Sequence, residues 1–414
     1  MNVLFVTWDG PQVTYLESLF LPIFRQLRRA GFRFHVLQFT WGNLEASKAR
    51  QIACKDSGVA YRSVTIWRRP LAAGSLLSAV KGALDIRKAI REYDIDVIMP
   101  RSTLPALATL IALRGKGLPI VFDADGLPLD ERVDFAGLSP SSFSYRLLRD
   151  IEAQTVRRSS IVMTRSVDAV KTLIARAGAG TQPAKFHVVT NGRDSNIFRT
   201  MDSDFREHVR QRLGLKENAP LVIYAGSMGP KYSLGAMLHL FSLIRHRAPD
   251  AQLLILTGTP EYVISALDAY PELKPAITTM RVPSHRIPEY LACADLGLAL
   301  IKPTYSMQAA SAIKLGEYLL CGLPVVATAG IGDTSAVVNE HVGFVINDVD
   351  SDSQLEAAAN WFVNVVLPAR EAFRDRCRRV GIASFSLNEA VNNYQCAFDK
   401  VRNLTKERGN DYLR

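Results

Sequence analysis

The sequence lacks the features that mark several classes of protein. Its few cysteines are widely spaced and form no CxxC pair, which argues against a disulfide framework or a zinc site and predicts buried, reduced thiols. The seven histidines show no metal-ligand spacing, so no metal site is expected. No window approaches the ~18 consecutive apolar residues of a membrane span, and the first residues lack the basic segment of a secretory signal. These absences predict a cytoplasmic protein.

Charge is distributed unevenly along the 414 residues. Residues 1–200 carry 28 Lys and Arg against 17 Asp and Glu, a net charge of +11, whereas residues 201–414 carry 22 against 23, a net charge of −1. The composition, 48% hydrophobic and 22% charged, is that of a globular protein of two or three domains and excludes a disordered tail protein. A basic half can meet nucleic acid, an anionic membrane surface or a phosphate-bearing substrate, and charge alone does not choose among them.

Short apolar runs alternate with helical patterns, which is typical of doubly wound α/β sheets. Strands are predicted at 3–7, 32–39, 96–99, 120–123, 161–164 and 185–189, then at 221–225, 253–257, 277–282, 296–300, 324–327 and 343–346. The turn Asn191-Gly192 separates the two series. We expect an N-terminal Rossmann-like domain over 1–192, completed by a C-terminal helix at about 386–414, and a second over 193–385. Their strand ends are expected to face each other across a ligand cleft.

A glycine loop follows the predicted strand at 221–225. It contains Gly226, Ser227, Gly229 and Lys231. Glycines let backbone N–H groups approach an anion, a helix N-terminus adds its positive dipole end, and the lysine adds a full charge. The loop is neither a Walker A loop nor GxGxxG. Taken alone, it is better interpreted as an ordinary turn.

A lysine and a glutamate share one face of the helix predicted at 312–321. Lys314 and Glu317 are three residues apart, and Ser311 is placed to cap the helix start. If this helix starts at the edge of a sheet, the lysine and the backbone N–H groups at the helix start can contact a diphosphate. The glutamate can then accept hydrogen bonds from ribose hydroxyls. A surface ion pair worth about 0.3 kcal/mol explains the spacing equally well.

Polar residues also follow the predicted strands of the first half. They are Asp9, Gly10, Arg101, Asp123 and Asp125. They are expected to line the cleft, where a carboxylate could accept a proton from a hydroxyl group of a bound substrate. The alternative for the two aspartates after residue 122 is a capped turn, since Asp-Gly is a turn signal. The segment 130–132 belongs either to this cluster or to a solvated helix start.

A basic cluster in the first half of the chain surrounds an amphipathic stretch. Its members are Arg62, Arg68, Arg69, Lys81, Arg87, Lys88 and Arg91, around Trp67, Leu76, Leu77, Val80 and Leu84. The stretch either rests on anionic lipid headgroups or is a solvated arginine-rich face. Aromatic side chains do not interleave with the charges as they do on base-stacking surfaces, so nucleic acid is not expected as the partner.

Several segments, in the order 301–303, 311–319, 322–326 and 330–333, resemble the donor-binding region of family 4 glycosyltransferases, which are retaining enzymes of the GT-B fold. Segments 122–126, 189–192 and 224–229 are similar to a subgroup associated with bacterial surface polysaccharides. The resemblance extends over almost the whole chain. It implies an acceptor-binding first domain and a donor-binding second domain.

The resemblance also implies roles for individual residues. Glu317 would bind the donor ribose, and Lys231 and Lys314 would hold the diphosphate. The amides of the glycine loop and of Ser311, Ala312 and Ile313 would assist them, and Arg281 and Val282 would lie where the nucleotide base is read. The implied reaction is a metal-independent, retaining hexosyl transfer from a UDP- or GDP-linked sugar, without a cofactor. The expected acceptor is a saccharide or a polyprenyl-diphosphate-linked saccharide, since the basic first half can meet both lipid headgroups and a diphosphate. The expected location is the cytoplasm, either free or at the inner face of the plasma membrane.

Two residues depart from the family pattern. Ala309 stands where the E-x7-E motif has its first glutamate, and Ser227 replaces the usual arginine of the glycine loop. These departures keep a second interpretation open, in which the chain is a catalytically inactive GT-B module that binds a nucleotide sugar or partner proteins.

Overall fold

The chain divides into two compact units. The computed structural model describes residues 1–41, 44–68 and 71–411. Unit 1 comprises residues Met1–Thr190 and the chain from Ala390 onward, and unit 2 comprises Asn191–Glu389. Each unit is an α/β structure around a parallel sheet, so the predicted pair of doubly wound domains is confirmed.

Unit 1 is built on parallel strands in the order β3-β2-β1-β4-β5-β6-β7. Hydrogen-bonded ladders join the first four strands and the last three, and isolated bridges from Ile98 to Ile120 and from Arg101 to Asp123 connect β4 with β5. The strands are β1 (Asn2–Trp8), β2 (Arg33–Thr40), β3 (Ala60–Thr65), β4 (Val97–Pro100), β5 (Val121–Asp123), β6 (Ile161–Thr164) and β7 (Phe186–Val188). The order reverses between β1 and β4, which is where open α/β sheets form ligand crevices.

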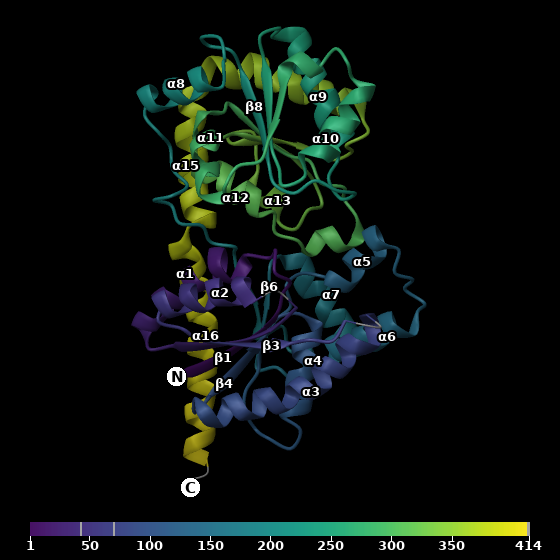
Figure 1. Ribbon diagram of the computed structural model, residues 1–414, viewed down its shortest axis with the longest axis vertical. Helices are drawn as coiled ribbons and strands as arrows, with labels where there is room; N and C mark the ends of the chain where they lie inside the picture. Colours follow the sequence, from purple (N-terminus) through teal and green to yellow (C-terminus); the bar gives the residue numbers. More distant parts are fainter. Residues whose placement is uncertain (42–43, 69–70, 412–414) are drawn as a thin grey trace. The chain divides into compact units, whose positions relative to one another are not determined.

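Helices cover both faces of this sheet, with α1 and α2 on one face and α3 and α4 on the other (Figure 1). They are α1 (Leu21–Leu27, preceded by a wide turn at Leu16–Phe20), α2 (Leu44–Asp56), α3 (Leu71–Glu92), α4 (Thr103–Ala112), α5 (Pro128–Ala136), α6 (Phe143–Arg158), α7 (Val167–Ala177) and α16 (Leu387–Asp411). Phe398 of α16 packs against Phe32 and Phe34, so the C-terminal helix completes the core of unit 1.

Unit 2 has a parallel sheet in the order β10-β9-β8-β11-β12-β13. Its strands are β8 (Leu221–Ala225), β9 (Gln252–Leu256), β10 (Ile277–Met280), β11 (Leu296–Ala299), β12 (Val325–Thr328) and β13 (Gly343–Ile346). All residues of β8, β11 and β12 are buried. This burial is the reason that they read as unbroken apolar runs and were predicted within a residue or so.

Two apolar cores lie on the two faces of the unit 2 sheet. One is formed with α9 and α14, and the other with α11, α12 and α15. The helices are α8 (Ser203–Arg212), α9 (Leu234–Arg247), α10 (Pro260–Ala266), α11 (Ile287–Cys293), α12 (Ile313–Leu320), α13 (Thr334–Val337), α14 (Asp352–Trp361) and α15 (Arg370–Phe385). In Figure 1, α9 and α10 lie on one side of β8, and α11 and α12 lie on the other.

Glycines allow α12 to pack very closely against its neighbours. A Cβ atom added at Gly381 of α15 would lie 2.6 Å from the backbone carbonyl carbon of Leu319, and one at Gly297 of β11 would lie 2.5 Å from the ring of Tyr318. The Tyr318 hydroxyl also accepts a hydrogen bond from the amide of Ala225, at 2.9 Å. The position of α12 is therefore fixed from both sides.

Replacing Gly381 by alanine is expected to lower the free energy of unfolding by about 1 to 3 kcal/mol, because the new methyl group must displace backbone. The matched control is Gly235→Ala near the start of α9, where an added Cβ meets nothing within 4 Å. That substitution should stabilise by about 0.5 kcal/mol. Chemical denaturation of the two variants measures both; equal stability would contradict the close packing of α12 and α15.

Several sequence predictions were wrong or incomplete. No element is predicted for 44–65 or for 352–385, where the structure has α2, β3, α14 and α15. The strand predicted to end at 282 ends at Met280. Four cysteines are buried as predicted, but Cys396 is exposed. Arg69 of the basic cluster lies outside the described residues. Among the described helices, none is long and apolar enough to cross a membrane.

Candidate functional site

The side chain of Lys314 is buried between two tyrosines of unit 2. Its Nζ donates a hydrogen bond of 2.8 Å to the hydroxyl of Tyr224 and lies 4.0 Å and 4.2 Å from the ring centroids of Tyr224 and Tyr232. The Tyr224 hydroxyl in turn donates to the carbonyl oxygen of Ser227. These contacts hold the ammonium group beside the glycine loop, where an added Cβ at Gly226 would lie 3.2 Å from it.

Burial changes the acidity of this lysine strongly. The pKa of Lys314 falls to about 7, first because burial removes water from the ammonium group and then because the positive charge of Lys231 is near. The carboxylate of Glu317 opposes the shift. Two ammonium groups thus lie close enough to repel each other, an arrangement that an anion between them would relieve.

Glu317 is buried and paired with an arginine that the sequence reasoning missed. Nε of Arg193 donates to Oε1 of Glu317 at 2.8 Å, and a second guanidinium nitrogen contacts the same oxygen. The guanidinium group also lies 5.1 Å from the ring centroid of Phe198. Arg193 directly follows the Asn191-Gly192 turn, and that position was the one available signal for it. A surface ion pair between Lys314 and Glu317 is therefore the wrong interpretation, since both residues are buried.

The glycine loop lies between β8 and α9 as predicted. Gly226 has φ of +147°, a conformation that is essentially restricted to glycine. Ser227 is exposed and its hydroxyl lies 3.2 Å from that of Tyr232, Gly229 has open space around it, and the ammonium group of Lys231 lies 5.5 Å from the Tyr232 ring. Helix α9 begins only at Leu234, five residues beyond Gly229.

The start of α12 differs from the prediction. Ala312 is the N-cap and no side chain caps the helix, so the expected cap by Ser311 is wrong. The carbonyl oxygen of Ser311 instead accepts a hydrogen bond of 3.5 Å from the side chain of Asn191. Ile313 is the first helical residue. Ala309, eight residues before Glu317, is fully buried in the preceding turn.

The residues predicted near the base lie at the end of β10. The guanidinium group of Arg281 donates to the carbonyl oxygen of Gly258 at 2.7 Å, after the end of β9, and is largely exposed. Val282 is half-buried against the α11 side of the sheet. Both therefore lie at the carboxyl edge of the unit 2 sheet, as do the glycine loop and the start of α12.

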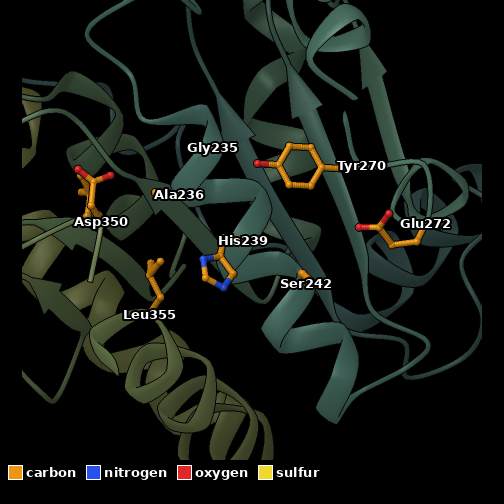
Figure 2. A pocket seen from close by; sticks show the side chains of 9 residues that line it. Gly235, Ala236, His239, Ser242, Tyr270, Glu272, Asp350 and Leu355 are labelled. Carbon is orange, nitrogen blue, oxygen red and sulfur yellow. The ribbon is translucent and has the colours of Figure 1, made fainter. Parts of the chain in front are cut away.

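Cavities in unit 2 also border α9. One of about 530 Å³ is lined in part by Tyr232, Lys302 and Asp348. Another, of about 410 Å³, has His239, Tyr270, Glu272 and Asp350 around it, with His239 coming from α9 (Figure 2). The described residues that line this second cavity include none of the predicted donor-site residues.

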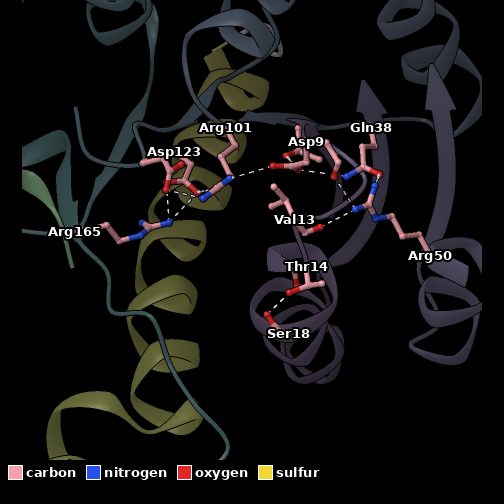
Figure 3. Close-up of polar contacts among 12 residues, drawn as sticks. Asp9, Val13, Thr14, Ser18, Gln38, Arg50, Arg101, Asp123 and Arg165 are labelled. Carbon is pink, nitrogen blue, oxygen red and sulfur yellow. Dashed lines mark hydrogen bonds and ion pairs between the residues drawn. The ribbon is translucent and has the colours of Figure 1, made fainter. Parts of the chain in front are cut away.

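In unit 1, four of the predicted acceptor-side residues form one ionic network, in which Arg101, Asp9 and Asp123 are buried and Asp125 is half-buried. Arg101 contacts Asp9 at 3.7 Å, Asp123 at 3.8 Å and Asp125 at 2.6 Å. Arg165, which was not predicted, donates to Asp123 at 2.9 Å (Figure 3). The network joins the ends of β1, β4, β5 and β6, and burial makes each of its ion pairs costly to break.

A buried arginine extends this network to the loop after β1. The guanidinium group of Arg50 donates to the carbonyl oxygen of Gly10 at 2.9 Å and to Glu17 at 3.0 Å. It also donates to the carbonyl oxygen of Val13 at 2.6 Å (Figure 3). Its Nη1 also bonds to Gln38, whose amide donates to Asp9. Several hydrogen bonds from Arg50 thus hold the loop that contains Gly10 at the edge of the sheet.

The structure describes the surroundings of the two acidic segments for which the sequence left alternatives open. Asp125 has φ of +53° and Gly126 has φ of +75°, so both the turn and the charge network describe Asp125. Asp130 lies in the first turn of α5, but it is buried and its ion pairs are with other residues than those of the Asp123 network, so both alternatives for this residue are wrong. It contacts Arg176 at 2.8 Å and the Tyr145 hydroxyl at 2.7 Å, in a cluster that packs α5, α6 and α7 together. Among the described residues, no group of His, Cys, Asp and Glu is arranged to hold a metal ion.

Comparison with known families identifies both halves of the chain. A model of the glycosyl transferase 4-like domain matches residues 18–192, and a model of the group 1 glycosyl transferases matches residues 205–379. Together the two matches span most of the chain.

Individual relatives agree with these matches. The chain is similar to α-maltose-1-phosphate synthase of Mycolicibacterium smegmatis, with 25% identity over 58% of this chain and 61% of the relative. It is also similar to the lipopolysaccharide glucosyltransferase WaaG of Escherichia coli, with 29% identity over 42% of this chain and 46% of the relative. The aligned part thus spans about three fifths or less of these relatives. The solved structure of Anabaena HepE with UDP and glucose has a TM-score of 0.71 at 19% identity, covering 96% of this chain and 99% of that one, which shows a shared GT-B fold.

Proposed function

Since the chain belongs to the GT-B glycosyltransferases that these two domain families describe, we propose that it moves a sugar from a nucleotide-diphosphate sugar to a saccharide or lipid-linked saccharide acceptor. The proposed transfer proceeds with retention and without a metal ion. It serves the assembly of a surface polysaccharide such as capsule, exopolysaccharide or lipopolysaccharide. The observation that carries the proposal is the buried ammonium group of Lys314 beside the glycine loop, with a second ammonium group near it.

The electrostatics of unit 2 support a diphosphate at this place. The leaving nucleotide departs with two negative charges, and preorganised cations stabilise such charge as it develops. Lys314 and Lys231 repel each other, so a dianion between them gains energy from both. The amides of Ser311, Ala312 and Ile313, at the uncapped start of α12, are proposed to add donors on the same side.

Glu317 is proposed to accept hydrogen bonds from the donor ribose. These bonds would replace part of its present contact with Arg193. The family match supports this role, and Arg281 and Val282 are proposed to flank the base. A UDP-linked donor is favoured by the UDP and glucose in the structure of Anabaena HepE, and a GDP-linked donor is the alternative. In unit 1, the network of Asp9, Arg101, Asp123 and Asp125 is proposed to shape the acceptor side.

Glu317→Gln is expected to weaken binding of the donor by about 10- to 100-fold, because a charge-assisted hydrogen bond is worth about 1.5 to 3 kcal/mol. The matched control is Glu356→Gln. Glu356 is an exposed residue of α14 that pairs with Arg247, and its replacement should leave donor binding unchanged. Calorimetric titration with UDP- and GDP-sugars measures the affinities. Unaltered affinity of the Glu317 variant for the nucleotide sugars would show that this residue does not contact the donor.

Release of free nucleotide from the same sugars separates two functions. Hydrolysis or transfer by the wild-type chain supports an enzyme. Tight binding with no turnover of any donor would instead support an inactive binding module, the alternative that Ala309 and Ser227 favour.

An exposed apolar stripe on unit 1 supports association with an anionic membrane. Leu77, Val80 and Leu84 of α3 are 55%, 51% and 64% exposed, and Trp67 nearby is 64% exposed. The ammonium group of Lys81 lies 5.8 Å from the ring centroid of Trp67. Apolar side chains flanked by cations are typical of interfacial helices. We therefore propose that the chain works peripherally at the cytoplasmic face of the membrane.

The double variant Leu77→Asp/Leu84→Asp is expected to reduce binding to vesicles containing phosphatidylglycerol by at least tenfold, because two apolar side chains no longer insert and two anions are added. Vesicle flotation measures the bound fraction. Ile264→Asp, which alters an exposed apolar residue of α10, is the control and should bind normally. Equal binding of wild type to uncharged phosphatidylcholine vesicles would contradict the proposed role of charge.

A further inference from the structure

Unit 1 contains a second concave feature that the ionic network does not account for. A cavity of about 470 Å³ lies at the carboxyl ends of the strands, a size within the range of small-molecule sites. Trp8, the last residue of β1, and Ser102, which follows β4, both line it. The strand order reverses between these two strands, so the cavity occupies the switch point at which open α/β sheets bind ligands.

The walls of this cavity combine an apolar surface with positive charge. Leucines, prolines and two tryptophans make up most of the lining, with Leu76 of α3 and Leu148 of α6 on its walls. Two exposed arginines, Arg68 and Arg132, also line it. The described lining residues include no Asp or Glu. Such a site favours a molecule with an apolar body and an anionic group over a neutral sugar or a cation.

The residues of one wall of the cavity are closely packed around Trp41. The guanidinium group of Arg68 lies 4.3 Å from the ring centroid of Trp41, which holds the arginine over the indole. A Cβ atom added at Gly10 would lie 2.8 Å from the same indole ring. Gly10 is itself held by the hydrogen bond from Arg50 to its carbonyl oxygen. The loop after β1 thus gives the Trp41 ring its place in the wall.

We propose that this cavity is a binding site for an amphiphilic phosphate ester, with the alkyl chain against the leucines and tryptophans and the phosphate between Arg68 and Arg132. The interpretation of this ligand as the lipid part of the acceptor rests on the function proposed above, whereas the binding itself does not. One helix serves both apolar surfaces, because α3 places Leu76 in the cavity and the neighbouring Leu77 on the exposed stripe. The chain of a membrane-borne ligand could therefore reach the cavity along α3.

The test is direct binding of hexyl phosphate, hexanol and inorganic phosphate to the full chain, followed by the fluorescence of the tryptophans and by calorimetry. Hexyl phosphate should bind saturably and at least tenfold more tightly than either of the other two, because only it meets both the apolar and the cationic walls. Arg68→Ala and Arg132→Ala should each weaken hexyl phosphate by about tenfold and leave hexanol unaffected. Arg114→Ala, at an exposed arginine outside the lining, is the matched control and should change nothing.

Each outcome bears on the proposal. Equal affinity for hexanol would show an apolar cavity without anion recognition, and equal affinity for inorganic phosphate would show an anion site without a chain pocket; either overturns it, as does no binding of hexyl phosphate. Titration with UDP-sugar on the same variants should give wild-type affinity, since Lys314 and Glu317 belong to unit 2. If the chain binds hexyl phosphate specifically but turns over no nucleotide sugar, the proposed cavity site stands and the proposed transferase function is wrong.

Discussion

Replacing Lys314 by methionine is expected to lower turnover of the nucleotide sugar by a factor of about 10² to 10³, the usual effect of removing one preorganised group that stabilises developing charge. The same substitution should raise the free energy of unfolding by about 2 to 4 kcal/mol, because a buried ammonium group with a pKa near 7 is costly to the folded state. No donor is left unpaired, since the Tyr224 hydroxyl still donates to Ser227. Initial rates and chemical denaturation measure the two effects.

The opposite directions of these two effects make the prediction specific. If Lys314 merely stabilised the fold, its replacement would lower the free energy of unfolding and the activity of the protein together. Lys216→Met, at an exposed lysine paired with Asp250, is the matched control and should change neither quantity. Full activity of the Lys314 variant would contradict its assignment to the diphosphate.

Affinity for the nucleotide sugar is expected to fall by about tenfold per pH unit above pH 7, because the diphosphate binds the protonated form of Lys314, whose pKa is about 7 in the free protein. Below pH 7 this group is already charged and adds no pH dependence. Binding above pH 7 should therefore take up a proton. Calorimetry in buffers of different ionisation enthalpy measures the affinity and the proton uptake at once.

The same pKa predicts how stability changes with pH. Between about pH 7 and 10.5 the unfolded chain holds a proton on Lys314 that the folded chain has lost, so the free energy of unfolding should rise with pH in this window. The penalty is fully present below pH 7. In the Lys314→Met variant both pH dependences should vanish. A donor affinity that is flat from pH 7 to 9 in the wild type would contradict the proposed contact.

The sequence was most informative where burial produced a regular pattern. The strands of unit 2 are buried on both faces, so β8, β11 and β12 read as apolar runs bounded by turn residues. Prediction failed for β3, whose residues are mostly half-buried or exposed. It failed as well for α15, which buries Arg374 with a hydrogen bond to the carbonyl oxygen of Ala292 and carries Gly381 at its closest contact with α12. Tertiary packing determines these elements, and local pattern does not reveal it.

The candidate site shows the same division. The helical spacing marked Lys314 and Glu317 only as candidates, and the resemblance to a known family favoured them. Their surroundings could not be predicted. Arg193 is 124 residues from its partner Glu317, and Tyr224 is 90 residues from Lys314. Arg165 and Arg50 join their networks in the same long-range way. A short motif can mark a charged group, whereas the partners that bury and orient that group come from the fold.

The central claim is that unit 2 holds a nucleotide-diphosphate sugar at Lys314 and Glu317. A crystal structure of the chain soaked with UDP- or GDP-sugar tests it most directly. We predict the diphosphate within hydrogen-bonding distance of Nζ of Lys314 and the ribose hydroxyls on Glu317, with its contact to Arg193 loosened. A nucleotide bound elsewhere, with Lys314 still enclosed by Tyr224 and Tyr232 and the Arg193–Glu317 pair unchanged, would contradict the claim.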